Sequence, residues 1–241
     1  MAGFDTFPFT VRESTYTHAC MIFDDIDCYR RIASEFVLEG LNENEKCIMV
    51  TGSYKQTMIA EDFAEAGVTL NDYLGNGKLS IIDADEFPSE NRRFEPERVI
   101  DMWKVATDRA IAQGFKAFRL VCEPVFSLGR PEMFAERVNY QTFISEGLVP
   151  HYPFKYLLVF DRTLYPNEII KKAISSNPIL FYNDKLYTEN IYFIPPEVHS
   201  KKSMVPDEID AWLTNVEKNS ENVRSLQAAL TYISRSIRKQ L

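Results

Sequence analysis

The sequence predicts an α/β fold with three layers, in which a mainly parallel sheet carries helices on both faces. Short apolar runs alternate along the chain with longer segments whose apolar residues recur at helical spacing. In the run His18–Phe23 both alternating faces are largely apolar, as in strands that are covered on both sides. Alternation of this kind builds βαβ units and a parallel sheet.

The predicted elements follow one another in a regular order. The predicted strands cover residues 17–23, 47–51, 79–84, 117–122 and 156–161. The predicted helices cover residues 29–41, 52–67, 96–114, 131–146 and 166–175, with a short helix or turn at 70–74. Two late β runs, 179–182 and 191–194, are expected to pair through a turn at Asn183-Asp184, at a sheet edge or as a small flap.

Local signals mark where these elements begin and end. The acidic turn 24–27 supplies aspartate oxygens that can cap the first helix. Gly67 and Gly114 are typical helix stops, and Asn76-Gly77 is a strong turn signal. Pro96 is suited to the first turn of a helix, because its missing N–H is not needed there.

The C-terminal region has a different pattern. From residue 209 apolar residues recur in heptads, which predicts a coiled-coil seam that pairs two copies of the chain through residues 209–240. The alternative is an amphipathic helix folded onto its own domain. The predicted organisation is an N-terminal arm at 1–13, one domain at 14–200 and a C-terminal helix at 206–241.

Composition limits the classes of partner. The 241 residues carry a net charge of −8, which argues against a nucleic-acid groove and against binding to an anionic membrane surface. The four cysteines form no Cys-x-x-Cys pair, which suits a reducing cytoplasm. No signal peptide and no apolar run long enough to span a membrane is seen, so we expect a cytoplasmic protein.

The residues that could support catalysis or nucleotide binding are few. The segment 52–57 lies between a strand and a helix, but it has one glycine and lacks the Gly-Lys-Ser/Thr end of a phosphate loop. The aspartates at 24–27 would also repel a triphosphate. No catalytic set and no four-ligand metal motif stands out, so we predict no enzyme activity, no metal and no cofactor.

Two strand positions are candidate binding residues. His18 and Cys20 point to the same face of the first strand, and His18 is either a buried core histidine or, as the family resemblance given below implies, a ligand-sensing one. Glu123 ends a buried strand, so its carboxylate needs a partner, either Arg119 or a group from a neighbouring strand or ligand. Glu136 and Asn139 share a helical face and are expected to reach the same crevice.

Residues 16–198 contain an ordered set of short motifs: His18-Ala19-Cys20, Gly52, Phe94-Glu95-Pro96, Glu123, Glu136 with Asn139, Asn177-Pro178, and Asn190 with Phe193, Pro195 and Pro196. In order and spacing this set resembles the MEDS family, the sensory domain of methanogens and methylotrophs. The resemblance implies a RecA/KaiC-like fold without a phosphate loop. It also implies a pocket for a small, possibly one-carbon or hydrocarbon-derived ligand, lined by His18, Cys20 and Glu123. Phe94, Glu136 and Asn139 are predicted to belong to the same pocket.

The resemblance and the residues together predict a non-catalytic cytoplasmic sensory domain. It would signal through a dimerising C-terminal helix to a regulatory output protein, without contacting nucleic acid itself. Two alternatives stay open: a degenerate KaiC-like ATPase, and a protein-interaction module without a small ligand.

Overall fold

A parallel sheet in strand order β3-β2-β4-β5-β1-β6 runs through the first of the two compact units of the chain. The computed structural model describes residues 18–84, 96–124, 148, 151–182 and 185–194. The units are residues 1–190 and 191–241, and the elements below belong to the first of them.

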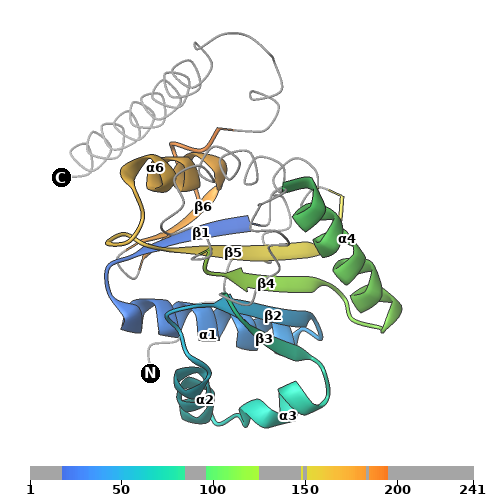
Figure 1. The fold of residues 1–241 in the computed structure, drawn as a ribbon. Coiled ribbons are helices and arrows are strands. Elements are labelled where there is room, and N and C mark those ends of the chain that lie inside the picture. Colours follow the sequence, from blue (N-terminus) through green and yellow to red (C-terminus); the bar gives the residue numbers. More distant parts are fainter. Residues whose placement is uncertain (1–17, 85–95, 125–147, 149–150, 183–184, 195–241) are drawn as a thin grey trace, which may run out of the picture. The chain divides into compact units, whose positions relative to one another are not determined.

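Of the seven strands in the described residues, the first six match predicted apolar runs and the last was not predicted. They are β1 (His18–Phe23), β2 (Lys46–Thr51), β3 (Leu79–Asp83), β4 (Phe118–Cys122), β5 (Phe154–Asp161), β6 (Ile179–Tyr182) and β7 (Lys185–Tyr187). All neighbouring pairs are parallel except β6 and β7, which are antiparallel. The strand β1 lies between β5 and β6, so the chain crosses two strand positions between β1 and β2 (Figure 1).

Helices cover both faces of this sheet, as predicted. The described helices are α1 (Ile26–Asn42), α2 (Gln56–Glu65), α3 (Leu70–Gly75), α4 (Pro96–Ala112) and α6 (Asn167–Ser176). One apolar core joins α1, α2 and α3 to the face that carries Met21 and Val121. The other joins α4 and α6 to the face that carries Cys20 and Leu158. In Figure 1, α1 is drawn alongside β2 and β3, and α6 is drawn beside β6.

The acidic turn caps α1, as its sequence predicts. Asp25 is the N-cap residue, and its carboxylate accepts a hydrogen bond of 3.0 Å from the backbone N–H of Asp27. The helix begins at Ile26, three residues before the predicted start. The second helix begins at Gln56, so residues 52–55 form a loop between β2 and α2 that the sequence pattern had placed in the helix.

One predicted strand is wrong. Residues 191–194 do not form a strand, and β6 pairs with β7 instead. Tyr182 stands opposite Lys185, so only two residues separate the paired ends of β6 and β7. With so short a connection, the strand that pairs with β6 begins at Lys185 rather than at residue 191. The predicted arm 1–13, the predicted helix 131–146 and the C-terminal helix 206–241 lie outside the described residues.

Candidate functional site

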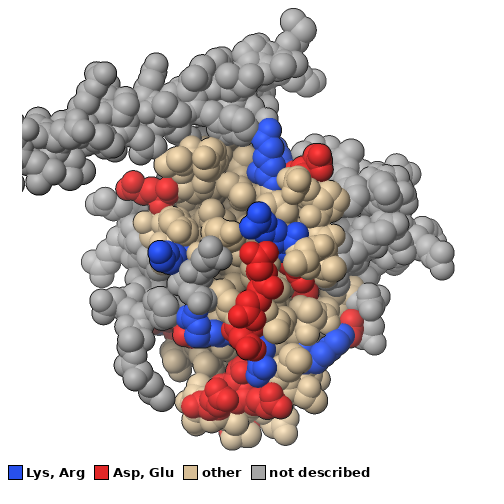
Figure 2. Space-filling view, turned by 90° about the vertical axis from the view of Figure 1, so that its left-hand side faces the viewer, with Lys and Arg blue, Asp and Glu red and all other residues tan. Residues whose placement is uncertain are grey.

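Glu123 stands at the carboxyl ends of the central strands, the edge where open α/β sheets bind ligands. It directly follows β4, and its N–H extends the ladder by donating to the carbonyl oxygen of Val50 over 2.7 Å. The residue is fully buried. In Figure 1 these strand ends point to the left, and Figure 2 views the same edge face on.

The Glu123 carboxylate accepts three hydrogen bonds from the loop that follows β2. The backbone N–H groups of Gly52 and Ser53 donate to Oε2 over 2.8 and 2.9 Å, and the Ser53 hydroxyl donates to Oε1 over 2.6 Å. Of the partners that the sequence left open, the neighbouring strand is therefore the correct one. Two successive N–H groups aimed at one anionic oxygen make a small anion-binding nest, and here the chain's own carboxylate fills it.

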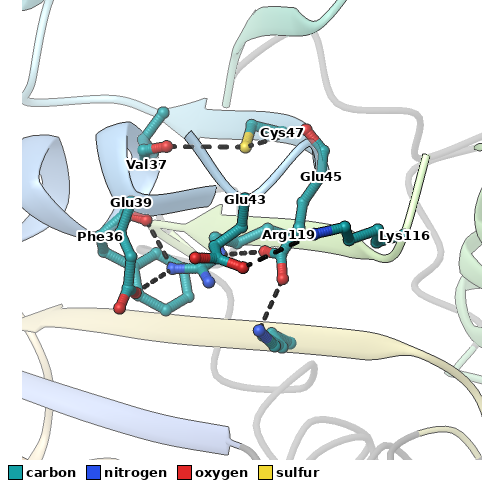
Figure 3. A network of polar contacts seen from close by, with 9 residues as sticks. Phe36, Val37, Glu39, Glu43, Glu45, Cys47, Lys116 and Arg119 are labelled. Atoms are coloured by element: carbon teal, nitrogen blue, oxygen red, sulfur yellow. Dashed lines mark hydrogen bonds and ion pairs between the residues drawn. The ribbon is translucent and has the colours of Figure 1, made fainter. Parts of the chain in front are cut away.

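Arg119, the other predicted partner of Glu123, belongs to a separate ionic network near the start of β4 (Figure 3). Its guanidinium donates to Glu45 over 2.5 Å, to Glu39 over 2.6 Å and to the carbonyl oxygen of Phe36 over 2.7 Å. Lys155 donates to the second oxygen of Glu45 over 2.6 Å. This network joins the last turns of α1 to strands β4 and β5, and it lies far from the carboxyl edge because Arg119 is the second residue of β4.

Three aromatic rings form a chain of contacts next to Ser53, in the loop that donates to Glu123. Tyr29 stacks on Phe23 at 5.1 Å between ring centroids and meets Tyr54 edge to face at 5.3 Å. Tyr54 follows Ser53 directly, and its hydroxyl donates to Asp62. Burial, and after it the charge of Glu123, raises the pKa of Tyr29 well above its ordinary value, so this phenol stays protonated.

Acidic side chains surround this edge on the solvent side. Asp24, Asp25, Asp27 and Glu61 are exposed, and Figure 2 shows acidic groups gathered along the middle and lower part of the face. Arg30 offsets part of this charge, because it pairs with Asp62 over 2.8 Å and with Glu61 over 3.3 Å. An anionic ligand such as a triphosphate would approach against a negative potential here.

His18 lies in a second polar cluster, at the opposite end of β1. Its ring stacks on Tyr156 at 5.0 Å, and its Nε2–H donates to the carbonyl oxygen of Ser176 over 3.2 Å. Asn177 follows Ser176 and is equally buried, and its side-chain N–H donates to the carbonyl oxygen of Ala173 over 2.7 Å. Burial lowers the pKa of His18 to about 3, since an imidazolium loses its hydration there, so His18 is neutral at physiological pH.

Cys20 is a buried thiol in the core beneath α4 and α6. It pairs in register with Leu158, which in turn pairs with Cys122, so the two thiols stand in one row about 10 Å apart. Burial raises the pKa of Cys20 and keeps it a thiol rather than a thiolate. Among the described residues no three His, Cys, Asp or Glu side chains are grouped so that they could hold a metal ion.

The structure does not bring His18 and Glu123 together. By register they are offset by three residues along the strands and by two strand positions, about 10 Å in each direction. Phe94, Glu136 and Asn139 lie outside the described residues. The sequence did not single out Tyr29 or Ser53, and the signal that could have found them is their place just after the carboxyl ends of β1 and β2.

These features define a class: an α/β protein with a parallel sheet whose strand-end loop is closed by an internal carboxylate. Residues 17–178 match the family described as MEthanogen/methylotroph, DcmR Sensory domain, and the chain therefore belongs to the MEDS family. This bears out the resemblance drawn from the motifs.

The chain is similar in structure to a KaiC-like protein from the hyperthermophilic archaeon Pyrococcus horikoshii OT3, with 17% sequence identity, coverage of 68% of this chain and 69% of that one, and a TM-score of 0.45. A comparison with curated proteins finds no match. None of the helices in the described ranges is both long and apolar enough to cross a membrane.

Proposed function

We propose that this chain is a non-catalytic cytoplasmic sensor that binds a small, uncharged molecule and signals to a regulatory output protein through a dimerising C-terminal helix. Membership of a sensory-domain family supports the sensory part of this proposal. The hydrogen bonds of Glu123 support the choice of an uncharged ligand.

The observation that carries the proposal is the placement of the Glu123 carboxylate. A nucleotide phosphate at a strand-to-helix loop needs free backbone N–H groups. The N–H groups of Gly52 and Ser53 both donate hydrogen bonds to the Glu123 carboxylate, over 2.8 and 2.9 Å. A phosphate would have to displace a buried carboxylate that also repels it, which favours an uncharged ligand over ATP.

Titration calorimetry of the full chain with Mg-ATP tests this directly. We expect no saturable heat with the wild-type protein. A Glu123→Gln variant keeps the shape of the side chain and removes its charge. It therefore separates the electrostatic repulsion of ATP from the occupancy of the Gly52-Ser53 loop by the side chain. Saturable, magnesium-dependent binding of ATP by the wild-type chain would contradict the proposal and favour the alternative of a degenerate nucleotide-binding ATPase.

Native mass spectrometry of the protein from its own host tests whether a small molecule is bound at all. We expect a mass increment that is lost on denaturation. A chain that carries no increment, and whose stability no host extract of small molecules raises, would instead favour an interaction module without a ligand.

The proposed dimer is tested by the mass of the protein in solution. Light scattering should give twice the chain mass for residues 1–241 and the monomer mass for a variant ending at residue 205. Circular dichroism of the shortened variant serves as the folding control. An unchanged dimer after truncation would show that the C-terminal heptads do not pair the chains.

A further inference from the structure

The hydroxyl group of Tyr29 is a buried polar group without a partner in the described part of the chain. Tyr29 has no exposed surface, and its hydroxyl oxygen makes no hydrogen bond to any of the described residues. Buried phenols normally donate to an acceptor, because an unsatisfied hydroxyl costs about 1–3 kcal/mol. An acceptor for the Tyr29 hydroxyl proton would therefore stabilise the folded protein.

Glu123 has the complementary property. A carboxylate offers about four acceptor positions. Among the described residues, Oε2 accepts from the N–H groups of Gly52 and Ser53, whereas Oε1 accepts only from the Ser53 hydroxyl. With respect to these residues, one acceptor position on Oε1 remains for a further donor.

The two groups belong to the same small region. The Tyr29 ring meets the Tyr54 ring at 5.3 Å, and Tyr54 directly follows Ser53, whose hydroxyl donates to Glu123. The Phe23 ring stacks on the other side of Tyr29. Polar groups in apolar surroundings of this kind select ligands by a few directed hydrogen bonds.

We propose that Tyr29 and Glu123 together bind one hydroxyl group of a small, otherwise apolar molecule. The ligand oxygen accepts the Tyr29 proton, and the ligand O–H donates to Oε1 of Glu123. A carboxylate is excluded because it has no proton for Glu123 and repels it, and a phosphate is excluded because its negative charge repels Glu123. An ammonium group has no lone pair for the Tyr29 proton. The inference rests on the proposed sensory function and names the class of ligand and its binding residues.

Isopropanol and acetone form a matched pair of probes, because both can accept from Tyr29 but only isopropanol can donate to Glu123. In a titration of the isotope-labelled full chain followed by NMR, we expect isopropanol to shift the Gly52 and Ser53 amide signals saturably. Acetone should bind at least about tenfold more weakly, the loss that one hydrogen bond to a charged group produces.

The Tyr29→Phe variant removes only the hydroxyl and should weaken isopropanol binding by about tenfold. Tyr73→Phe, on α3, is the matched control and should leave it unchanged. Equal binding by the wild type and Tyr29→Phe, or equal binding of the two probes, would overturn the assignment.

A crystal structure of the full chain soaked in isopropanol gives a second readout that does not depend on any variant. Density for the whole alcohol in contact with both Tyr29 and Glu123 supports the assignment, and density for a lone oxygen assigns a water and overturns it. A bound host molecule together with no response to isopropanol would leave the sensory function standing and reject only this site.

Discussion

Replacing Arg119 by methionine should destabilise the protein by about 3 kcal/mol, because the change leaves buried acceptors without their donor. The side chain of Arg119 is 1% exposed and makes three charge-assisted hydrogen bonds, to Glu45, Glu39 and the carbonyl oxygen of Phe36. Each such bond contributes about 1.5–3 kcal/mol. The summed loss of these hydrogen bonds is therefore larger than the net destabilisation that we expect from the substitution.

Two features of the network reduce the loss. Glu45 keeps its bond to Lys155, and the Glu39 side chain, which is already 23% exposed, can turn toward water. The methionine also restores apolar contact with the Phe36 ring, over which the guanidinium now lies at 4.6 Å. About 3 kcal/mol corresponds to a fall in Tm of about 6–12 °C for a domain of this size.

Urea unfolding followed by circular dichroism measures the effect. Lys116→Met is the control, since the Lys116 side chain is 69% exposed and its ion pair with Glu43 is long, at 4.0 Å. Loss of the Lys116 ammonium should cost less than about 0.5 kcal/mol. The double variant Arg119→Met with Glu45→Met should recover at least half of the loss, because no buried carboxylate is then left behind. A change below about 1 kcal/mol for Arg119→Met, or no recovery in the double variant, would refute this account.

Two further predictions concern buried positions. Gly40→Ala should lower the free energy of unfolding in urea by about 1–3 kcal/mol, because the new Cβ would lie 2.6 Å from Cδ of Arg119 and 2.9 Å from Sγ of Cys47. Gly75→Ala is the control and should leave the stability unchanged, because nothing lies within 4 Å of its Cβ. Equal effects of the two substitutions would contradict the close packing at Gly40. His18 has a folded-state pKa of about 3 against 6.5, so the unfolded chain binds the extra proton and stability falls as the pH drops from 6.5 toward 3. From pH 7 to pH 4.5 the wild type should lose roughly 2–3 kcal/mol more than His18→Phe, and parallel stability curves would contradict the neutral buried histidine.

The fold class was predictable because its signal is local. Strands buried on both faces must be apolar on both faces, as in His18–Phe23, and the helices between them show their own period. The failure at residues 191–194 is also local: an apolar, aromatic run is typical of a strand, but Lys185–Tyr187 is the segment that a two-residue connection from β6 can reach.

The partners of Arg119 and Glu123 were not predictable, because they depend on strand order. The sheet places β2 beside β4 and moves β3 to the outside, which brings the Gly52-Ser53 loop to the end of β4. Nothing in the spacing of the sequence fixes that order. The same order separates His18 from Glu123, although both belong to the family's set of motifs.

The placement of Glu123 is the physical reason why we propose an uncharged ligand next to a strand-to-helix loop that could otherwise bind an anion. A loop between a parallel strand and a helix presents N–H groups, and such a loop binds phosphate when nothing else accepts from it. Here Gly52 and Ser53 donate to a carboxylate of the same chain, and the exposed aspartates at 24, 25 and 27 add negative charge at the adjoining turn. The N–H groups of the loop thus already bind an anion of the same chain, and the proposed ligand would use the Tyr29 hydroxyl and the remaining acceptor position on Oε1 of the charged Glu123 carboxylate. Removing the carboxylate, rather than adding a glycine-rich loop, is therefore the change that should move this site toward anion binding.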